Sequence, residues 1–304
     1  MKPVSLIIGS RGSNLALYQA NLIKSVLEKK HSCRVSIKIV KTSGDKIDDI
    51  SFDKMEGKCF FTKELEDSLL SHEIDLAVHS LKDLMTVQPD GLKLGAVGYR
   101  ADRREMLLIR KESRIGNGVL PVKEGGIIGT SSARRKCQIN FHNDSLQIKD
   151  LRGNVPTRVN KLRQGMYDTI VIAVAGVKRL GLDLSDLDAI ELEPETFLPA
   201  PAQGILGIQI RSDDEKTDAV VSKMNSCDAA AEAALERGLL AEFDSGCSLP
   251  LGVYSEIESE RYRLKAVLGV PAAEGWGSIR SVDISGDNID DVVMNAFRRL
   301  NEDE

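Results

Sequence analysis

Six arginines stand just after predicted strands, either in the turn or in the first turn of the helix that follows. They are Arg11, Arg134, Arg135, Arg152, Arg158 and Arg179. A guanidinium group is a planar fork of donors that suits carboxylate or phosphate. One such arginine is ordinarily a solvated residue, but six in equivalent places predict a ligand with several carboxylates. Phosphate is disfavoured because the chain has neither a G-x-x-x-x-G-K-[ST] loop nor a G-x-G-x-x-G fingerprint.

A carboxylate and a thiol complete the reactive set. Asp83 follows the run IDLAVHS at 74–80, where it could cap a following helix or, in a cleft lined with arginines, stabilise positive charge or move a proton. Cys247 stands in the turn SGCSLP at 245–250, which predicts an exposed thiol. It could be a transient nucleophile or a permanent attachment point. His79 is predicted to be a packed, hydrogen-bonded residue of the strand.

The other four cysteines are predicted to be small buried hydrophobic residues: Cys33, Cys59, Cys137 and Cys227. The five cysteines lie far apart with no C-x-x-C pair, which speaks against a disulfide framework and a structural zinc site, so no metal is expected. A Ser/His/Asp hydrolase is excluded because no G-x-S-x-G motif is present.

The overall composition narrows the class of protein. A chain of 304 residues with 42% apolar and 29% charged residues predicts a soluble globular protein of two or three domains. A net charge of −5 argues against nucleic-acid binding, and no apolar run has the length of a membrane span. The N-terminus leads directly into a strand without a signal-like segment, so a cytoplasmic protein is expected.

Strand–turn–helix units position the arginines. The strand VSLIIGS at 4–10 leads through a Gly/Ser turn into a helix from residue 14, and such a helix start offers free N–H groups to an anion. Residues 125–142 repeat this order. The segments 62–83 and 155–179 also look alike, each with a helix, a polar turn, an aspartate and a buried strand. We therefore predict two similar α/β halves whose strand-end turns face a cleft.

The remaining segments connect or follow these halves. The polar stretch 43–59 is interpreted either as a lid or as surface disorder. Thr62 is predicted to cap the next helix. The Pro-rich run 193–211 predicts a return to the first half. Beyond residue 217, an Ala-rich helix at 227–243, three alternating segments and a closing helix predict a small antiparallel sheet covered by helices.

Eight stretches, in this order, resemble the porphobilinogen deaminase (hydroxymethylbilane synthase) family over essentially the whole chain. They are SRGSNLALYQA (10–20), FTKELEDSLL (61–70), DLAVHSLKD (75–83), GTSSARRKCQ (129–138), LRGNVPTR (151–158), AVAGVKRLG (173–181), LPAPAQGILGI (198–208) and SGCSLPLG (245–252). Each motif alone is weak, but the ordered set is specific.

The resemblance implies an α/β fold with two similar doubly wound domains that form a hinged cleft, as in periplasmic binding proteins, and a small α+β third domain with an antiparallel sheet. Domain 1, with the active-site cleft, is expected at 1–101 plus 197–216. Domain 2, the arginine-rich wall, is expected at 102–196, and domain 3, with the cofactor cysteine, at 217–304. A cytoplasmic monomer without nucleic-acid or membrane partners is expected.

The resemblance implies that Cys247 carries a dipyrromethane cofactor, assembled from the enzyme's own substrate, through a thioether. The implied catalytic residues are Asp83, Lys82 and Arg11. The implied cofactor-binding residues, besides Cys247, are Ser13, Lys82, Asp83, Thr130, Ser131, Arg134, Arg135 and Arg152. The implied substrate-binding residues are Arg11, Ser13, Arg152, Arg158, Arg179 and Gln203.

The implied activity is that of a transferase acting on porphobilinogen. Four molecules are joined head to tail with loss of ammonia, and water releases linear hydroxymethylbilane. Each pyrrole ring carries an acetate and a propionate, so the growing oligopyrrole is a polyanion that needs many guanidinium groups. Loss of ammonia leaves positive charge at the ring N–H, which the Asp83 carboxylate can stabilise.

Three positions depart from the family pattern. Cys59 stands where glycine is usual, Leu84-Met85 replaces Leu-Pro or Val-Pro, and Ala202 replaces a glycine that is common before Gln203. These changes affect loop geometry rather than the catalytic groups. Two alternatives remain at this stage: a non-enzymatic two-lobed polycarboxylate-binding protein, and a cysteine-nucleophile transferase without a cofactor, in which Cys247 is a free thiol.

Overall fold

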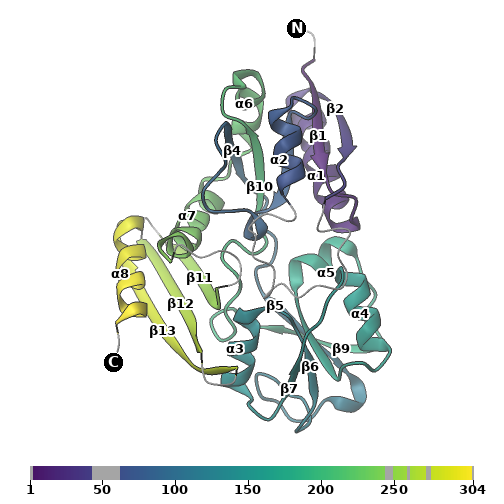
Figure 1. The fold of residues 1–304 in the computed structure, drawn as a ribbon, viewed down its shortest axis with the longest axis vertical. Coiled ribbons are helices and arrows are strands. Elements are labelled where there is room, and N and C mark those ends of the chain that lie inside the picture. Colours follow the sequence, from purple (N-terminus) through teal and green to yellow (C-terminus); the bar gives the residue numbers. More distant parts are fainter. Residues whose placement is uncertain (1–2, 43–61, 244–248, 259–260, 272–274, 303–304) are drawn as a thin grey trace. The chain divides into compact units, whose positions relative to one another are not determined.

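The computed structural model describes residues 3–42, 62–243, 249–258, 261–271 and 275–302 (Figure 1). The chain divides into two compact units. The first contains Met1–Ala101 and Gly204–Ala233, and the second contains Asp102–Gln203 and Ala234–Glu304. The three-domain boundaries and the hinged cleft expected from the sequence stay predictions.

The first unit is built on a five-stranded sheet with the order β2-β1-β3-β10-β4. Strands β1, β2 and β3 are parallel, whereas β10 runs antiparallel to both of its neighbours. The strands are β1 (Ser5–Ser10), β2 (Arg34–Ile39), β3 (Leu76–Ser80), β4 (Leu92–Gly98) and β10 (Leu206–Arg211). The helices are α1 (Asn14–His31), α2 (Lys63–Leu70) and α6 (Glu215–Val221).

Helices cover both faces of this sheet because successive residues of a strand point to opposite sides. Leu76 of β3 packs with Ile23 and other residues of α1. The next residue, Ala77, packs with Leu69 of α2. A strand buried on both faces reads as a continuous apolar run, which is why β1 and β3 were recognisable in the sequence.

The second unit contains a sheet of matching design, with the order β7-β6-β8-β5-β9. Strands β6, β7 and β8 are parallel, and β5 is antiparallel to β8 and β9. The elements are β5 (Glu105–Arg110), β6 (Ile127–Gly129), β7 (Gln147–Lys149), β8 (Thr169–Ala173), β9 (Leu187–Leu192), α3 (Ala133–His142), α4 (Val155–Arg163) and α5 (Val174–Leu180). Ile170 of β8 packs with Val159 of α4, and its neighbour Val171 packs with Ile139 of α3. The prediction of two similar α/β halves is confirmed.

The second unit also holds the small antiparallel sheet expected from the sequence, formed by β11 (Leu251–Glu258), β12 (Arg261–Pro271) and β13 (Trp276–Gly286). Leu239 of α7 (Cys227–Glu242) and Ala296 of α8 (Ile289–Asn301) pack with Val253 and other residues of the sheet. Helix α3 lies close to β12, since a Cβ on Gly269 would come within 2.8 Å of the Cys137 Cβ.

Some local expectations were wrong. Thr62 occupies the start of α2, but its side chain makes no capping hydrogen bond. Cys227 is exposed, whereas Cys33 and Cys137 are buried as predicted. Cys227 is the first residue of α7, where a side chain need not face the core. None of the helices in the described ranges has the length and apolarity that crossing a bilayer requires.

Candidate active site

Lys82 and Asp83 lie in a short turn that follows β3. The turn is the 3₁₀ helix Leu81–Asp83, and Leu81 is fully buried with its N–H donating to the carbonyl of Ile205 at 2.9 Å. Leu84 is buried as well, so the apolar residues on either side turn the exposed Asp83 away from the core. The element that follows is strand β4, so Asp83 does not cap a helix, which was the alternative considered from the sequence.

Arg11 and Ser13 lie in the turn between β1 and α1. The Ser13 hydroxyl accepts a hydrogen bond from the N–H of Ala16 at 3.3 Å and thereby caps α1. Because β1 and β3 are adjacent and parallel, this turn and the turn with Asp83 lie at the same edge of the sheet. The Gln19 side chain joins the two elements by donating to the Ser80 hydroxyl at 2.9 Å. The structure therefore brings together four predicted site residues of the first unit.

His79 is buried next to this edge, and its ring nitrogen Nε2 lies 3.1 Å from Oε1 of Gln209. Burial lowers the pKa of His79 from 6.5 to about 4; the hydrogen bond with Gln209 opposes this shift, and the charge of Arg11 adds to it. The side chain is therefore neutral at neutral pH, which agrees with the predicted packed histidine.

The second sheet gathers the other predicted residues at the corresponding edge. Thr130, Ser131, Arg134 and Arg135 follow β6, Arg152 and Arg158 follow β7, and Arg179 follows β8. The three strands are parallel neighbours, so their ends meet at one edge. One placement was wrong: Arg179 lies in the last turn of α5, rather than in a strand-end turn or a first helical turn.

Arg134 and Arg135 are almost fully buried and share one carboxylate. Arg134 donates to Oε1 of Glu105 at 2.5 Å, and Arg135 donates to both oxygens at 3.1 and 2.7 Å. Their remaining bonds go to the carbonyls of Leu198 and Val171. Two guanidinium groups with one carboxylate leave the cluster with a net positive charge. Their predicted cofactor-binding role stays a prediction, but Glu105 holds them in place.

Glu105 was not identified from the sequence. It is fully buried at the start of β5, where it precedes the apolar run of residues 106–109. A carboxylate next to a buried strand needs a cationic or hydrogen-bonding partner. The position of Glu105 beside an apolar run could therefore have indicated a buried ion pair.

The side chains of Thr130 and Ser131 both contact backbone groups. The Ser131 hydroxyl donates to the carbonyl of Leu151 and accepts from its N–H, both at 3.1 Å. The Thr130 hydroxyl accepts from the N–H of Ser132 at 3.2 Å. The two bonds of Ser131 tie the turn after β6 to the turn that carries Arg152.

Gln203 is fully buried, and its amide donates to the carbonyls of Arg103 at 2.9 Å and Arg104 at 3.4 Å. The residue before it, Ala202, has a φ of 60°, a conformation that favours glycine. Its N–H donates to the buried carboxylate of Glu236 at 2.6 Å. The predicted substrate contact of Gln203 stays a prediction.

Cys247, Cys59 and the polar stretch 43–59 lie outside the described residues. Phe243 and Leu249, on the two sides of residues 244–248, both pack against the core of the third sheet. Burial raises the pKa of the Cys137 thiol to about 11, with Arg134 opposing the shift, so this cysteine is a structural residue and not a nucleophile.

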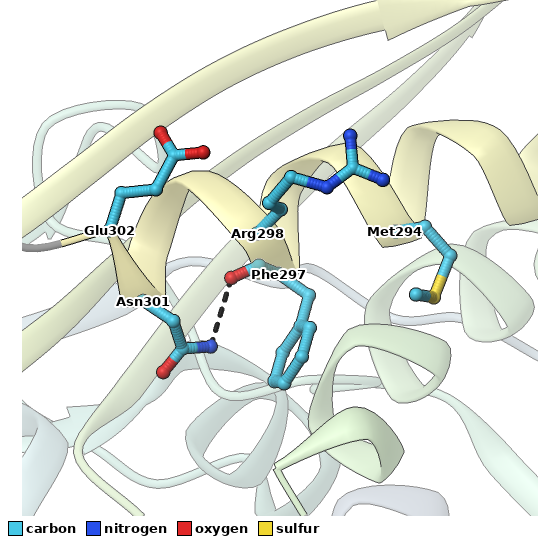
Figure 2. A pocket seen from close by; sticks show the side chains of 5 residues that line it. All are labelled: Met294, Phe297, Arg298, Asn301 and Glu302. Carbon is cyan, nitrogen blue, oxygen red and sulfur yellow. Dashed lines mark hydrogen bonds between the residues drawn. The ribbon is translucent and has the colours of Figure 1, made fainter.

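A pocket along α8 is separate from these edges. Figure 2 shows its lining residues, which are Met294, Phe297, Arg298, Asn301 and Glu302. Asn301 donates to the carbonyl of Phe297 at 2.9 Å. None of these residues belongs to the predicted site. In the described part of the chain, no group of three or more His, Cys, Asp and Glu side chains is arranged to hold a metal ion.

Comparison with known families decides between the remaining interpretations. Residues 6–219 match the model described as "Porphobilinogen deaminase, dipyromethane cofactor binding domain", and residues 230–286 match the model of the C-terminal domain of that enzyme. The chain belongs to the porphobilinogen deaminase family. Its first matched segment is therefore a dipyrromethane cofactor-binding domain.

Curated relatives agree with this assignment. The porphobilinogen deaminase of Sulfurimonas denitrificans is 40% identical over 275 residues, which cover 88% of this chain and 85% of the relative. That of Nitratiruptor sp. is 42% identical over 269 residues, covering 88% of this chain and 84% of the relative. An ancestral arginine-binding protein of solved structure aligns with 74% of this chain and 92% of its own length at 13% identity, with a TM-score of 0.41, too low to support any argument about fold or ligand.

Proposed function

We propose that this protein is a porphobilinogen deaminase, a transferase that joins four porphobilinogen molecules head to tail with loss of ammonia and releases linear hydroxymethylbilane. The observation that carries the proposal is the match of residues 6–219 and 230–286 to the two domain models of this family. The alternatives, a non-enzymatic polycarboxylate-binding protein and a cysteine transferase without cofactor, have no comparable support.

The substrate is bound, in this proposal, through its carboxylates. The proposed substrate-binding residues are Arg11, Ser13, Arg152, Arg158, Arg179 and Gln203. The arginines follow parallel strands of the two sheets, and each guanidinium offers two parallel donors to an acetate or propionate. A ligand that gains carboxylates with each addition needs such a series of cations rather than a single site.

Asp83 is the proposed catalytic carboxylate. Loss of ammonia from porphobilinogen develops positive charge on the pyrrole, and a fixed carboxylate lowers the energy of that state. The structure supports this role because Asp83 is exposed at the sheet edge while Leu81 and Leu84 are buried. Lys82 in the same turn and Arg11 at the end of the adjacent strand complete the proposed catalytic group.

Cys247 is the proposed attachment point of the dipyrromethane, through a thioether. When bound, this group supplies the carbon to which the first porphobilinogen is joined. The proposed residues that hold it are Ser13, Lys82, Asp83, Thr130, Ser131, Arg134, Arg135 and Arg152. The donor set fits a group with four carboxylates, because the Glu105 cluster keeps a net positive charge and α3 begins without a side-chain cap on its N–H groups.

The remaining features of the proposal concern the domains, the location and the partners of the protein. We propose a cytoplasmic monomer with domains at 1–101 plus 197–216, 102–196 and 217–304. The protein is proposed to act on porphobilinogen and the growing oligopyrrole without nucleic-acid or membrane partners.

The test is the stoichiometry of the reaction. The purified protein is incubated with porphobilinogen while substrate consumption, ammonia and linear tetrapyrrole are measured together. Four molecules of porphobilinogen and four of ammonia per tetrapyrrole would agree with the proposal. Binding of porphobilinogen without ammonia release would contradict it and favour the binding protein.

A further inference from the structure

A chain of hydrogen bonds runs from the core of the first sheet to the segment that follows Asp83. His79 of β3 and Gln209 of β10 lie 3.1 Å apart, from Nε2 to Oε1. Nε2 of Gln209 donates to Oε1 of Gln88 at 2.9 Å, and Nε2 of Gln88 donates to the carbonyl of Met85 at 2.8 Å. The chain thus ends two residues after Asp83.

The direction of each bond is set by groups that can only accept. The carbonyl of Met85 requires the amide nitrogen of Gln88, so Oε1 of Gln88 faces Gln209. Gln209 directs its own amide nitrogen both to Gln88 and, at 3.4 Å, to the carboxylate of Glu66. Its Oε1 therefore faces His79, and the neutral imidazole must carry its proton on Nε2. No member of the chain can turn without leaving another unsatisfied.

The two ends of this chain differ in their surroundings. His79 and Gln209 are buried between strands, with 6% and 0% of their surface exposed. Gln88 is half-buried and lies in residues 84–91, which form neither helix nor strand. The chain therefore links an irregular segment to the rigid sheet.

The N–H of Leu81, before Asp83, donates to the carbonyl of Ile205, and the N–H of Leu84, after it, donates back to the carbonyl of Leu81. On the C-terminal side of Asp83, the amide of Gln88 donates to the carbonyl of Met85. A small error in the position of a reacting group has a large effect on rate.

We propose that Gln88 is a positioning residue, which holds the carbonyl of Met85 and thereby fixes the orientation of the Asp83 carboxylate. The inference rests on the proposed role of Asp83. It predicts that Gln88 affects the chemical step more than the binding of substrate, because its hydrogen bonds run to Met85 and Gln209 and not to the arginines proposed to bind carboxylates.

Two replacements of Gln88 distinguish the effect of its hydrogen bonds from the effect of its side-chain volume. Gln88→Met keeps the length of the side chain but removes both hydrogen bonds. Gln88→Glu can still accept from Gln209, but its carboxylate cannot donate to Met85. Both variants should lower kcat roughly tenfold, because a tenfold change in rate corresponds to the free energy of about one hydrogen bond. They should change KM less than twofold. Gln147→Met, on exposed β7, is the control and should leave both constants unchanged.

A double variant tests whether the chain acts as one unit. Gln209→Glu still accepts from His79 but cannot donate to Gln88, so it should reproduce the fall in kcat. Combining it with Gln88→Met should lower kcat no further than either change alone. Independent, multiplying effects would contradict a continuous chain.

The intact mass and melting temperature of every variant are measured beside kcat and KM. Wild-type kcat in Gln88→Glu, an equal change in KM, or a fall in melting temperature or cofactor loading that accounts for the loss would overturn the proposal. The proposed function fails separately, since in that case the wild-type protein would release no ammonia.

Discussion

The two five-stranded sheets share one strand order but use their charged residues differently. In both, an antiparallel strand is inserted beside the third parallel strand, and that strand, β10 or β5, begins just after the chain passes from one unit to the other. The two edges therefore present comparable turns. The first edge leaves the Asp83 carboxylate exposed, whereas the second buries two arginines on Glu105.

A pair of aspartates shows what the sheets share. Asp75 accepts from the N–H of Ile7 at 2.7 Å, and Asp168 accepts from the N–H of Ile127 at 2.9 Å. Each thereby joins the start of the third parallel strand to the first parallel strand. Asp75 has an ion-pair partner in Arg211, and Asp168 has one in Lys123.

The two edges therefore differ in the role of their charged residues: some stabilise the fold, and others can contact a ligand. A charge with buried partners fixes the fold and is costly to remove, whereas an exposed charge costs little and can act on a ligand. The contrast between Glu105 and Asp83 makes opposite predictions for stability and for turnover.

The largest effect is expected for Glu105→Ala. It leaves two buried guanidinium groups without their carboxylate, which should lower the free energy of unfolding by about 3–5 kcal/mol. Glu73→Ala is the control, because the pair of Glu73 with Lys38 is exposed and should contribute at most about 1 kcal/mol. Denaturation by urea measures both variants. Equal effects would show that Glu105 is not a structural charge.

Asp83→Asn is expected to lower kcat about 100-fold to 1,000-fold, since it removes the charge that faces the reaction, with little change in melting temperature. Its counterpart is Asp168→Asn. Hydrogen bonds from Ile127, Lys123 and Ser113 outweigh burial and lower the pKa of Asp168 to about 2, so this change should cost about 2 kcal/mol of stability. A stable, fully active Asp83→Asn protein would contradict the catalytic role of the exposed carboxylate.

The buried His79 should make the first unit sensitive to acid. Its pKa in the folded state, about 4, lies below the ordinary value of 6.5, so its contribution is complete above pH 6.5 and is lost as the pH falls toward 4. The loss should be about 2 kcal/mol at pH 5. Melting temperatures of wild type and His79→Gln between pH 7 and 5 measure it, and an equal decline in the variant would assign the sensitivity to other groups.

The smallest effect is expected at Ala202. Its φ of 60° is strained for alanine, so Ala202→Gly should raise the free energy of unfolding by roughly 0.5–1 kcal/mol. Ala231→Gly within α7 should lower it by about 1 kcal/mol. A loss of stability in both variants would mean that the left-handed conformation is not the source of strain.

Much of this architecture could be predicted from residue patterns. Continuous apolar runs indicated the strands β1, β3, β8 and β10, because a strand buried on both faces is apolar throughout. Alternation of apolar and polar residues indicated β11, β12 and β13, because a strand buried on one face has a period of two. Strands β4, β5 and β9 were not identified. Charged residues crowd the start of β5, a pattern that does not indicate a strand inside a sheet.

The positions of site residues were predictable where they follow strands, but their partners were not. Nothing near Arg134 in the sequence identifies Glu105, which lies 29 residues away, and nothing near Gln88 identifies Gln209, 121 residues away. Long-range pairing of buried polar groups depends on the assembled sheet, and only the polar residues within apolar strands indicated that such partners exist.

The central claim is that Cys247 carries the primer on which the chain of pyrroles is built. The most direct measurement is the intact mass of the denatured protein, wild type beside Cys247→Ser. An excess equal to two linked pyrrole units in the wild type, absent from the variant, is the predicted result. A wild-type protein that has the mass of the bare chain, and gains no adduct after incubation with porphobilinogen, would contradict the claim.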